Sequence, residues 1–345
     1  MSAGAPRAGE PMWAVVFHRY GGPGVLEMTE VPVPRLRPGE VLVRTASSGL
    51  SAVDLDYRSG AVRLHGLGFP KQTGFDALGQ VVDSRSAHVP VGAWVWCVLG
   101  LEPLRRRGTA VEYLAIDDTR VGLFPHGWIP PERLGSLPLG ALTALCALRD
   151  AARARPGQRI LVVGAGGAVG TAALQLARMR GIGADAVTGA SGLEVCAELG
   201  AQEVVDHHDI RGTERLRRGL YDAAILAAGR AEDWIEAVRP AGRMALTRPA
   251  AAWPGPRSAA RVLRRRLVVR PVLAGHEAGD LTRLASLAAR GRLRPVVGRS
   301  YGIEDLARAH AEHGRGGTCG ARLIIHRRGP GRLAAAEDPR TPPAR

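Results

Sequence analysis

The sequence predicts an α/β protein in which a β-rich first part precedes a doubly wound parallel sheet, and three observations lead to this prediction. The chain has 345 residues, enough for about two domains of ordinary size. Short β-branched runs separated by Gly and Pro dominate its first third, whereas apolar strands alternate with amphipathic helices after about residue 130. A glycine-rich turn also joins the first of these strands to the helix after it.

The first third has the pattern of a small barrel. Prolines 32, 34 and 38 exclude a helix where they stand, because proline lacks the backbone N–H that a helix interior needs. The expected strands are Trp13–Phe17, Val41–Thr45, Gln80–Val82 and Val111–Ile116.

The second part alternates between strand and helix. Apolar strands between amphipathic helices predict a parallel sheet with both faces covered. The expected helices are Pro130 to about Ala152, Ala168–Met179, Leu193–Leu199, Trp234–Val238, Leu281–Ala289 and Ile303–His310. The expected strands are Arg159–Val163, Asp185–Thr188, Val204–Asp206, Tyr221–Leu226, Arg243–Thr247, Leu267–Leu273 and Ala321–Ile325.

The glycine-rich turn is the strongest functional motif, since residues 159–170 read RILVVGAGGAVG. A diphosphate binds well against free N–H groups at a helix N-terminus, where the helix dipole favours negative charge. A side chain at Gly164 or Gly167 would hold the backbone away from it, and Gly170 lets helix and strand pack closely. The motif predicts a Rossmann-type dinucleotide site made by Gly164, Gly167, Ala168, Val169 and Gly170.

The tip of the second strand indicates which dinucleotide binds. An acidic residue there would hold the ribose 2′-hydroxyl of NAD. The segment after Ala186 reads VTGAS and contains no acid, while Ser191 could donate to a 2′-phosphate. This favours NADPH and leaves NADH possible; Ser191 could instead only cap the following helix.

Composition narrows the class of protein and its location. The net charge is +15, but all except one of the 47 basic residues are arginine, they are mostly scattered, and aromatic residues are only 4%. A nucleic-acid surface would gather basic residues together with stacking aromatics, so nucleic-acid binding is disfavoured. No signal peptide or membrane-spanning run is visible, which favours the cytoplasm. We expect disorder in residues 1–11 and in the Arg- and Pro-rich tail, 327–345.

The order of motifs resembles the medium-chain dehydrogenase/reductase superfamily, in particular its zinc-less quinone oxidoreductase and enoyl reductase-like branch. The similarity runs from about Gly21 to Ile325. The matching segments are Gly21–Glu27, Val31–Pro34, Pro38–Arg44, Gly49–Asp54 with Arg58 and Gly60, Thr73–Gly79, Gly92–Trp96, Gly108–Tyr113, Leu142–Ala144, Leu199–Ala201, Tyr221–Asp222, Gly242–Arg243 and Gly291–Pro295.

The resemblance implies a GroES-like β-barrel catalytic domain built from both chain ends, with a Rossmann domain inserted between them. On this basis we expect the catalytic domain at 12–126 and 283–326 and the NAD(P)-binding domain at 127–282. Members of the family are usually dimers joined through an edge strand of the Rossmann sheet, so a homodimer is expected through Leu267–Leu273, although an interior place in the sheet would explain this strand equally well.

Zinc is not expected. Zinc-dependent relatives carry a Cys in the segment matching Ala46–Asp54 and a His at the position of Phe75. This chain has no Cys in that segment, and phenylalanine cannot bind a metal, whereas catalytic zinc needs three protein ligands. Oxidation of an alcohol on zinc is therefore disfavoured.

Without a metal, hydride transfer suits an acceptor that is already electrophilic: an enone, a quinone or an enoyl thioester. The resemblance places Thr143 and Thr247 beside the nicotinamide, Ala228 along the ribose and diphosphate, and His207 beside the adenosine. The last could equally be an exposed loop histidine.

Two expected catalytic residues depart from the family pattern. Ser51 stands where relatives commonly have Asn, and Tyr57 follows the position, Asp56, at which many have a Tyr or Lys. We expect Ser51 and Tyr57 to act on the substrate, with water as another source of the proton. Asp54 is expected to be structural and to bind its own turn.

Three functions stay open. The first is NADPH-dependent reduction of an activated C=C bond or a quinone. The second is a biosynthetic enoyl reductase acting on a bulky polyketide-like or carrier-bound intermediate. The third is a catalytically weak NADPH-binding scaffold or sensor, which the changes at Ser51 and Asp56 would also fit.

Overall fold

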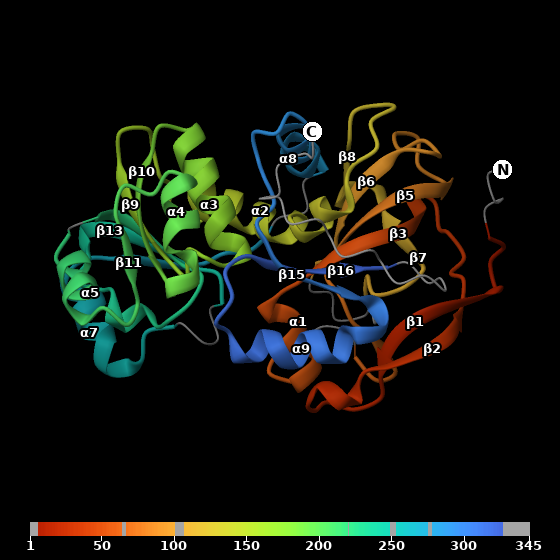
Figure 1. Ribbon diagram of the computed structural model, residues 1–345, viewed down its shortest axis with the longest axis horizontal. Helices are drawn as coiled ribbons and strands as arrows, with labels where there is room; N and C mark the ends of the chain where they lie inside the picture. Colours follow the sequence, from red (N-terminus) through yellow and green to blue (C-terminus); the bar gives the residue numbers. More distant parts are fainter. Residues whose placement is uncertain are drawn as a thin grey trace, which may run out of the picture.

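Two groups of strands organise the chain, one at each end of the molecule (Figure 1). The structure is a computed structural model that describes residues 6–63, 67–100, 107–219, 221–248, 253–274 and 278–326. The predicted disordered tail, 327–345, and the first five residues lie outside the described part.

The barrel half contains a three-stranded sheet of order β2-β1-β4 and a seven-stranded sheet of order β15-β16-β3-β5-β6-β8, in which β7 also pairs with β3. The last strand, β16, runs antiparallel to β3, so both ends of the chain build one sheet. Together with the inserted parallel sheet, this confirms the predicted fold class. The strands are β1 (Pro11–Phe17), β2 (Glu27–Pro32), β3 (Glu40–Leu50), β4 (Lys71–Gln72), β5 (Asp76–Ser84), β6 (Trp94–Val98), β7 (Tyr113–Asp117), β8 (Val121–Leu123), β15 (Val297–Gly302) and β16 (Ala321–Ile325).

The Rossmann half contains a six-stranded parallel sheet of order β11-β10-β9-β12-β13-β14. Counted along the chain, this order is 3-2-1-4-5-6, and it reverses between β9 and β12. Ligands of such sheets bind beyond the carboxyl ends of the strands at the reversal. The strands are β9 (Arg159–Val163), β10 (Gly183–Thr188), β11 (Val204–Asp206), β12 (Tyr221–Leu226), β13 (Val238–Leu246) and β14 (Val268–Pro271).

Helices cover both faces of this sheet, because alternate strand residues point to opposite sides. Ile160 and Val162 pack with α2, α3 and α4, whereas Leu161 and Val163 pack in a separate cluster with residues of α5 and α7. The helices are α1 (Ala52–Ser59), α2 (Pro138–Cys146), α3 (Ala168–Met179), α4 (Leu193–Glu198), α5 (Ile210–Arg217), α7 (Pro256–Arg264), α8 (Ala278–Ala289) and α9 (Leu306–Arg315). None of the described helices is long and apolar enough to cross a membrane.

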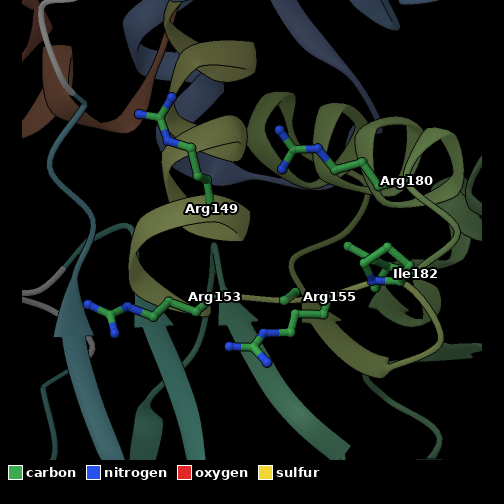
Figure 2. A pocket seen from close by; sticks show the side chains of 7 residues that line it. Arg149, Arg153, Arg155, Arg180 and Ile182 are labelled. Atoms are coloured by element: carbon green, nitrogen blue, oxygen red, sulfur yellow. The ribbon is translucent and has the colours of Figure 1, made fainter.

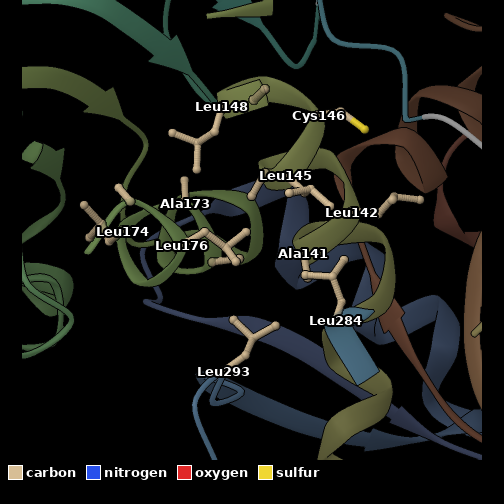
Figure 3. Packing of buried hydrophobic residues seen from close by; sticks show 14 of the residues in the cluster. Ala141, Leu142, Leu145, Cys146, Leu148, Ala173, Leu174, Leu176, Leu284 and Leu293 are labelled. Atoms are coloured by element: carbon tan, nitrogen blue, oxygen red, sulfur yellow. The ribbon is translucent and has the colours of Figure 1, made fainter. Parts of the chain in front are cut away.

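Helix α2 joins the two halves through the largest core cluster. Leu142, Leu145 and Leu148 in and after this helix pack with Leu176 of α3 and Leu284 of α8 (Figure 3). The same cluster includes barrel residues such as Trp96. Because burying one leucine side chain stabilises a fold by about 1.5–3 kcal/mol, this shared core holds the two sheets in one arrangement.

Two predicted helices differ from the structure. Trp234–Val238 was expected to be helical, but the chain makes a 3-10 turn at Ala231–Asp233 and enters β13 at Val238. Pro240 follows two residues later, and its ring prevents a helix from continuing through that point. The long helix expected from Pro130 is divided into a 3-10 turn at Glu132–Ser136, α2, and a wider turn at Ala147–Ala151. The predicted domain boundaries stay predictions.

Candidate active site

The glycine-rich turn lies at the carboxyl end of β9, beside the reversal of strand order. Gly164 has a φ of +79°, and a Cβ added there would stand 2.7 Å from the Cβ of Ala228. A Cβ at Gly170 would stand 2.5 Å from the Cα of Ala165, so α3 packs against the turn with no room for a side chain. These two positions require glycine for reasons of space.

Gly167 is different, because a Cβ there would meet only the carbonyl oxygen of Gly164, at 3.4 Å. Gly167 precedes α3, and no side chain among the described residues caps that helix. The first N–H groups of a helix have no partner within it, so the amides of Ala168 and Val169 are unused inside α3 and lie at the positive end of its dipole. This arrangement fits an anionic diphosphate.

The other predicted cofactor residues lie around the same edge of the sheet. Ala228 follows β12 and touches the turn, while the backbone N–H and the hydroxyl of Thr247, which follows β13, both donate to the carbonyl of Leu226, at 3.1 and 3.2 Å. Thr143 is half-buried in α2, whose Gly140 packs on Ala168. The structure thus brings Ala228 to the turn, places Thr143 in the helix whose Gly140 packs on Ala168, and fixes Thr247 on the neighbouring strand.

Ser191 and His207 lie at the tip of β10. Ser191 is exposed in a 3-10 turn, and Nδ1 of His207 lies 3.0 Å from the carbonyl oxygen of Thr188. His207 is 55% exposed, and its ring stacks near that of His208 at 3.9 Å. Asp206, His207 and His208 are the only cluster in the described chain with enough ligand atoms for a metal, and they are consecutive residues at the surface.

A segment of the barrel half closes over the glycine-rich turn, a contact that sequence reasoning missed. The N–H of Gly320 donates to the carbonyl of Gly166 at 2.7 Å, and the thiol of Cys319 lies 3.4 Å from the same oxygen. The segments are 153 residues apart in sequence. Neither the sequence around Gly166 nor the resemblance to the family indicated that residues 319–320 contact this turn.

Ser51 begins α1 and forms a capping box with Asp54. The N–H and the hydroxyl of Ser51 both donate to Oδ2 of Asp54, at 2.8 and 2.7 Å. Asp54 therefore binds its own turn, as predicted from the sequence. Burial raises the pKa of the Asp54 carboxyl to about 6.

A second buried carboxylate, Asp76, stands close to Asp54. Its two oxygens accept from the N–H of Gly49 and of Leu139, each at 3.0 Å, which connects β3 of the barrel to α2. Burial, and next the charge of Asp54, raise the pKa of Asp76 to about 7. The pair can hold a proton near neutral pH directly behind Ser51.

Tyr57 and Asp56 are consecutive in α1 and point to different places. Tyr57 is fully buried, and its ring meets Phe17 and Phe75 edge-on at centroid distances of 5.4 and 5.5 Å. Asp56 reaches the Rossmann half, where both its oxygens accept from Arg248. The predicted catalytic role of Tyr57 stays a prediction, and its ring is part of the barrel core.

A zinc ion does not fit the residues at this site. Phe75 offers no ligand atom and is packed among aromatic rings, and both oxygens of the adjacent Asp76 already accept backbone hydrogen bonds. Burial, and next the charge of Asp76, raise the pKa of the nearby Cys97 thiol, which disfavours the thiolate that zinc binds.

Comparisons with known proteins agree with this architecture. The family model "Alcohol dehydrogenase GroES-like domain" matches residues 37–126, and "Zinc-binding dehydrogenase" matches residues 199–323. Quinone oxidoreductase of Sus scrofa is 27% identical over 339 residues, which cover 89% of this chain and 96% of that protein.

Two further relatives are informative. The chloroplastic NADPH-dependent alkenal/one oxidoreductase of Arabidopsis thaliana is 28% identical over 256 residues, 71% of this chain and 64% of that protein. The solved structure of the quinone oxidoreductase from Coxiella burnetii has a TM-score of 0.80 at 22% identity and covers 92% of this chain and 100% of that one, which shows a common fold.

Proposed function

The chain belongs to the medium-chain dehydrogenase/reductase superfamily and is an oxidoreductase, and from this premise we propose that it reduces quinones or activated C=C bonds with NADPH and without zinc. The observation that carries the proposal is the turn at Gly164–Gly170, where the strand order reverses and only Gly167 leaves free space. Relatives named as quinone and NADPH-dependent alkenal/one oxidoreductases support the substrate class.

The proposed cofactor site uses residues from both halves. The amides of Ala168 and Val169 would hold the diphosphate, with Ala228 along its path. Thr143 and Thr247 would position the nicotinamide, and Ser191 and His207 would lie at the adenosine end. A bound nicotinamide supplies the hydride.

The choice of NADPH over NADH is supported by the tip of β10. The exposed Ser191 can donate to a 2′-phosphate. The carboxylate of Asp206, on the adjacent β11, already accepts from the N–H of His208 at 2.9 Å. We expect weaker binding of NADH, and equal or tighter binding would refute this part of the proposal.

Independence from zinc is supported by the residues around Phe75, since Phe75 has no ligand atom and both carboxylate oxygens of Asp76 already accept backbone hydrogen bonds. The chemistry assigned to this chain is therefore to bind and orient an electrophilic acceptor and to supply a proton to the enolate after reduction. Ser51 is the proposed hydroxyl for this step: it would give its proton to the enolate and take one back from the protonated carboxyl of Asp54, whose pKa is raised to about 6 and which then regains a proton from solvent. Tyr57 remains a second proposed donor.

The decisive experiment follows NADPH oxidation by the purified full chain with a panel of quinones, enones and enoyl thioesters. Turnover of at least one class is expected, and Gly167→Asp, which places a carboxylate against the diphosphate, should abolish it. Reduction restricted to long acyl thioesters would favour a biosynthetic enoyl reductase. Tight NADPH binding without consumption by any acceptor would favour the scaffold or sensor instead.

Metal content tests the zinc proposal separately. Elemental analysis of the purified protein should find far less than one zinc per chain, and overnight treatment with EDTA should leave the activity unchanged. Stoichiometric zinc whose removal abolishes turnover would refute it.

We also propose a homodimer joined through β14. In the described sheet this strand lies at the edge, with β13 on one side only. Leu263 and Leu273 beside it are 79% and 78% exposed. A free strand edge with exposed leucines favours pairing with a second copy of the chain.

A further inference from the structure

The amino end of the Rossmann sheet, opposite the glycine-rich turn, carries a hollow walled by arginines. It measures about 520 Å³ and is lined by Arg149, Arg153, Arg155 and Arg180 together with Ala154, Pro156 and Ile182. Figure 2 shows the four arginines coming from the end of the helical segment after α2, the loop before β9 and the end of α3. No acidic side chain lines this hollow.

A smaller hollow of about 180 Å³ continues the same surface. It shares Arg153 and Arg155 with the first and adds Arg239 and Arg243. Its lining contains one carboxylate, Asp222, which pairs with Arg239. Six arginines therefore line the two hollows together with one acidic residue, and two further carboxylates, Asp150 and Asp280, lie beside Arg149.

Most charge on this surface lacks a partner. Arg149 is paired with Asp150 and Asp280, but Arg153, Arg155 and Arg180 make no ion pair with any described residue. Elsewhere in the Rossmann half, arginines such as Arg215 and Arg265 are paired with glutamates. Other arginines of this half, such as Arg211 and Arg257, also make no ion pair with a described residue, so the distinctive feature of this surface is that several arginines line one hollow.

The guanidinium groups are close enough to repel one another. Burial, and next the charges of Arg283 and Arg149, lower the pKa of Arg180. Burial, and next the charges of Arg153 and Arg270, lower the pKa of Arg243. Arg153 is also held at a φ of +50°, a left-handed conformation that residues other than glycine rarely adopt. An anion in the hollow would remove the repulsion.

We propose that these two arginine-lined hollows form a binding site for a compact polyphosphate anion, separate from the cofactor site. The planar guanidinium group of an arginine can donate two parallel hydrogen bonds to the oxygens of one phosphate. A ligand with several linked phosphates can therefore bind several arginines at once, whereas a ligand with one carboxylate cannot. A volume of about 520 Å³ is in the range of small-molecule sites. The loop carrying Arg155 enters β9 at Arg159, whereas the glycine-rich turn leaves β9 after Val163, so β9 separates the two sites.

The test is calorimetric titration of inorganic tripolyphosphate into the full chain at low ionic strength. The exposed pair Arg153 and Arg155 is replaced together as Arg153→Asn and Arg155→Gln; asparagine tolerates the left-handed conformation better than other side chains. We expect the double variant to bind tripolyphosphate about tenfold more weakly or worse, because hydrogen bonds between charged groups are lost. Thermal melting checks that the variant is folded, and Arg180→Gln provides an independent variant.

The matched control removes the same charge elsewhere, with Arg211→Gln and Arg257→Gln, two exposed arginines on α5 and α7. The control should change the affinity less than about threefold, since only the general field of the protein changes. An equal loss in both variants would mean unspecific attraction to a basic protein and would overturn the proposal.

NADPH distinguishes this site from the cofactor site. Tripolyphosphate should bind with unchanged affinity when NADPH is present in excess. Displacement of tripolyphosphate by NADPH would place the anion on the glycine-rich turn and refute the second site. Absence of binding by the wild-type chain at millimolar tripolyphosphate would refute it as well.

Discussion

The guanidinium of Arg248 holds both carboxylate oxygens of Asp56, at 2.9 and 3.0 Å, and so connects the chain just after β13 to helix α1 of the barrel half. The two residues are 192 positions apart. Arg248 directly follows Thr247, the residue proposed to position the nicotinamide. The ion pair therefore fixes the position of α1, which Ser51 begins, relative to the end of β13.

We expect the ion pair between Arg248 and Asp56 to position α1 while contributing little to the free energy of unfolding. Arg248 is 42% exposed and Asp56 27%, and exposed ion pairs contribute less than about 1 kcal/mol. In a double-mutant cycle of Arg248→Gln and Asp56→Asn, urea unfolding should give a coupling free energy below about 1 kcal/mol. A coupling several times larger would contradict this view of a solvent-screened pair.

Replacing two glycines of the same turn by alanine should have different effects: one substitution should lower stability, and the other should weaken NADPH binding. Gly164→Ala adds a Cβ 2.7 Å from that of Ala228 at a positive φ, so we expect a loss of at least about 2 kcal/mol of unfolding free energy. Gly167→Ala adds a Cβ whose only neighbour within 4 Å is the carbonyl oxygen of Gly164, at 3.4 Å, so it should leave stability within about 0.5 kcal/mol while weakening NADPH binding strongly. Thermal melts and fluorescence titration with NADPH measure both effects. Normal NADPH affinity in Gly167→Ala would remove the main support for the cofactor site.

The buried His326 predicts a defined pH dependence. Its ring nitrogens lie 2.9 and 2.8 Å from the hydroxyls of Thr45 and Ser48, and burial lowers its pKa from 6.5 to about 3. Between pH 6.5 and about 3 the unfolded chain takes up a proton that the folded chain refuses, so stability falls as pH falls.

The comparison of wild type with His326→Gln isolates this effect, since His310 and His313, whose pKa values are also lowered, remain in both proteins. Below pH 6.5 the wild type should lose stability faster by about 1.4 kcal/mol per pH unit. Urea unfolding from pH 4.5 to 7.5 measures the two slopes, and parallel slopes would show that folding does not lower the pKa of His326.

Two hydroxyl variants separate the proposed proton donors. Ser51→Ala removes a hydroxyl that is bound to Asp54, and we expect kcat to fall about 100-fold, within the range of general acid catalysis. Tyr57→Phe keeps the packing of a fully buried ring, so we expect kcat to stay within about threefold of wild type. Steady-state kinetics with the best acceptor of the panel decide between them; the reverse order would make Tyr57 the donor.

The proposed dimer has its own test. Leu273→Lys places a charge beside the edge strand β14, and light scattering after gel filtration should change from the mass of two chains to that of one. Leu67→Lys, at another exposed leucine (62%) in the barrel half, should leave the mass unchanged. A wild-type chain that elutes as a monomer would contradict the proposal directly.

Patterns within short segments of the sequence predicted much of the fold, because strands, turns and helix starts are each specified by neighbouring residues. The run from Arg159 to Gly170 combines an apolar strand, a turn and a helix start in twelve consecutive positions, and the structure has β9, the turn and α3 there. The expected helix at Trp234–Val238 was wrong for the opposite reason, since this segment of five residues, four of them apolar, fits a turn and a strand before Pro240 as well as it fits a helix.

Contacts between the halves could not be predicted in the same way. Nothing near Arg248 in sequence indicates Asp56, and nothing near Gly166 indicates Gly320, because each pairing depends on how two separate sheets meet. The place of Tyr57 depended on the backbone of residues 52–59, which form a helix that points this side chain into the barrel. The arginine-lined hollow likewise appears only once Arg180 and Arg153 come from different elements to the same end of the sheet.

The pairing of β16 with β3 has a consequence for how the chain is made. Residues 47–50 of β3 are synthesised well before their partners, residues 322–325, because most of the described chain lies between them. Throughout translation the edge of β3 is exposed to other chains, and a product truncated before Ala321 never covers it. Such fragments should aggregate during expression, because they lack the strand that pairs with this edge of β3.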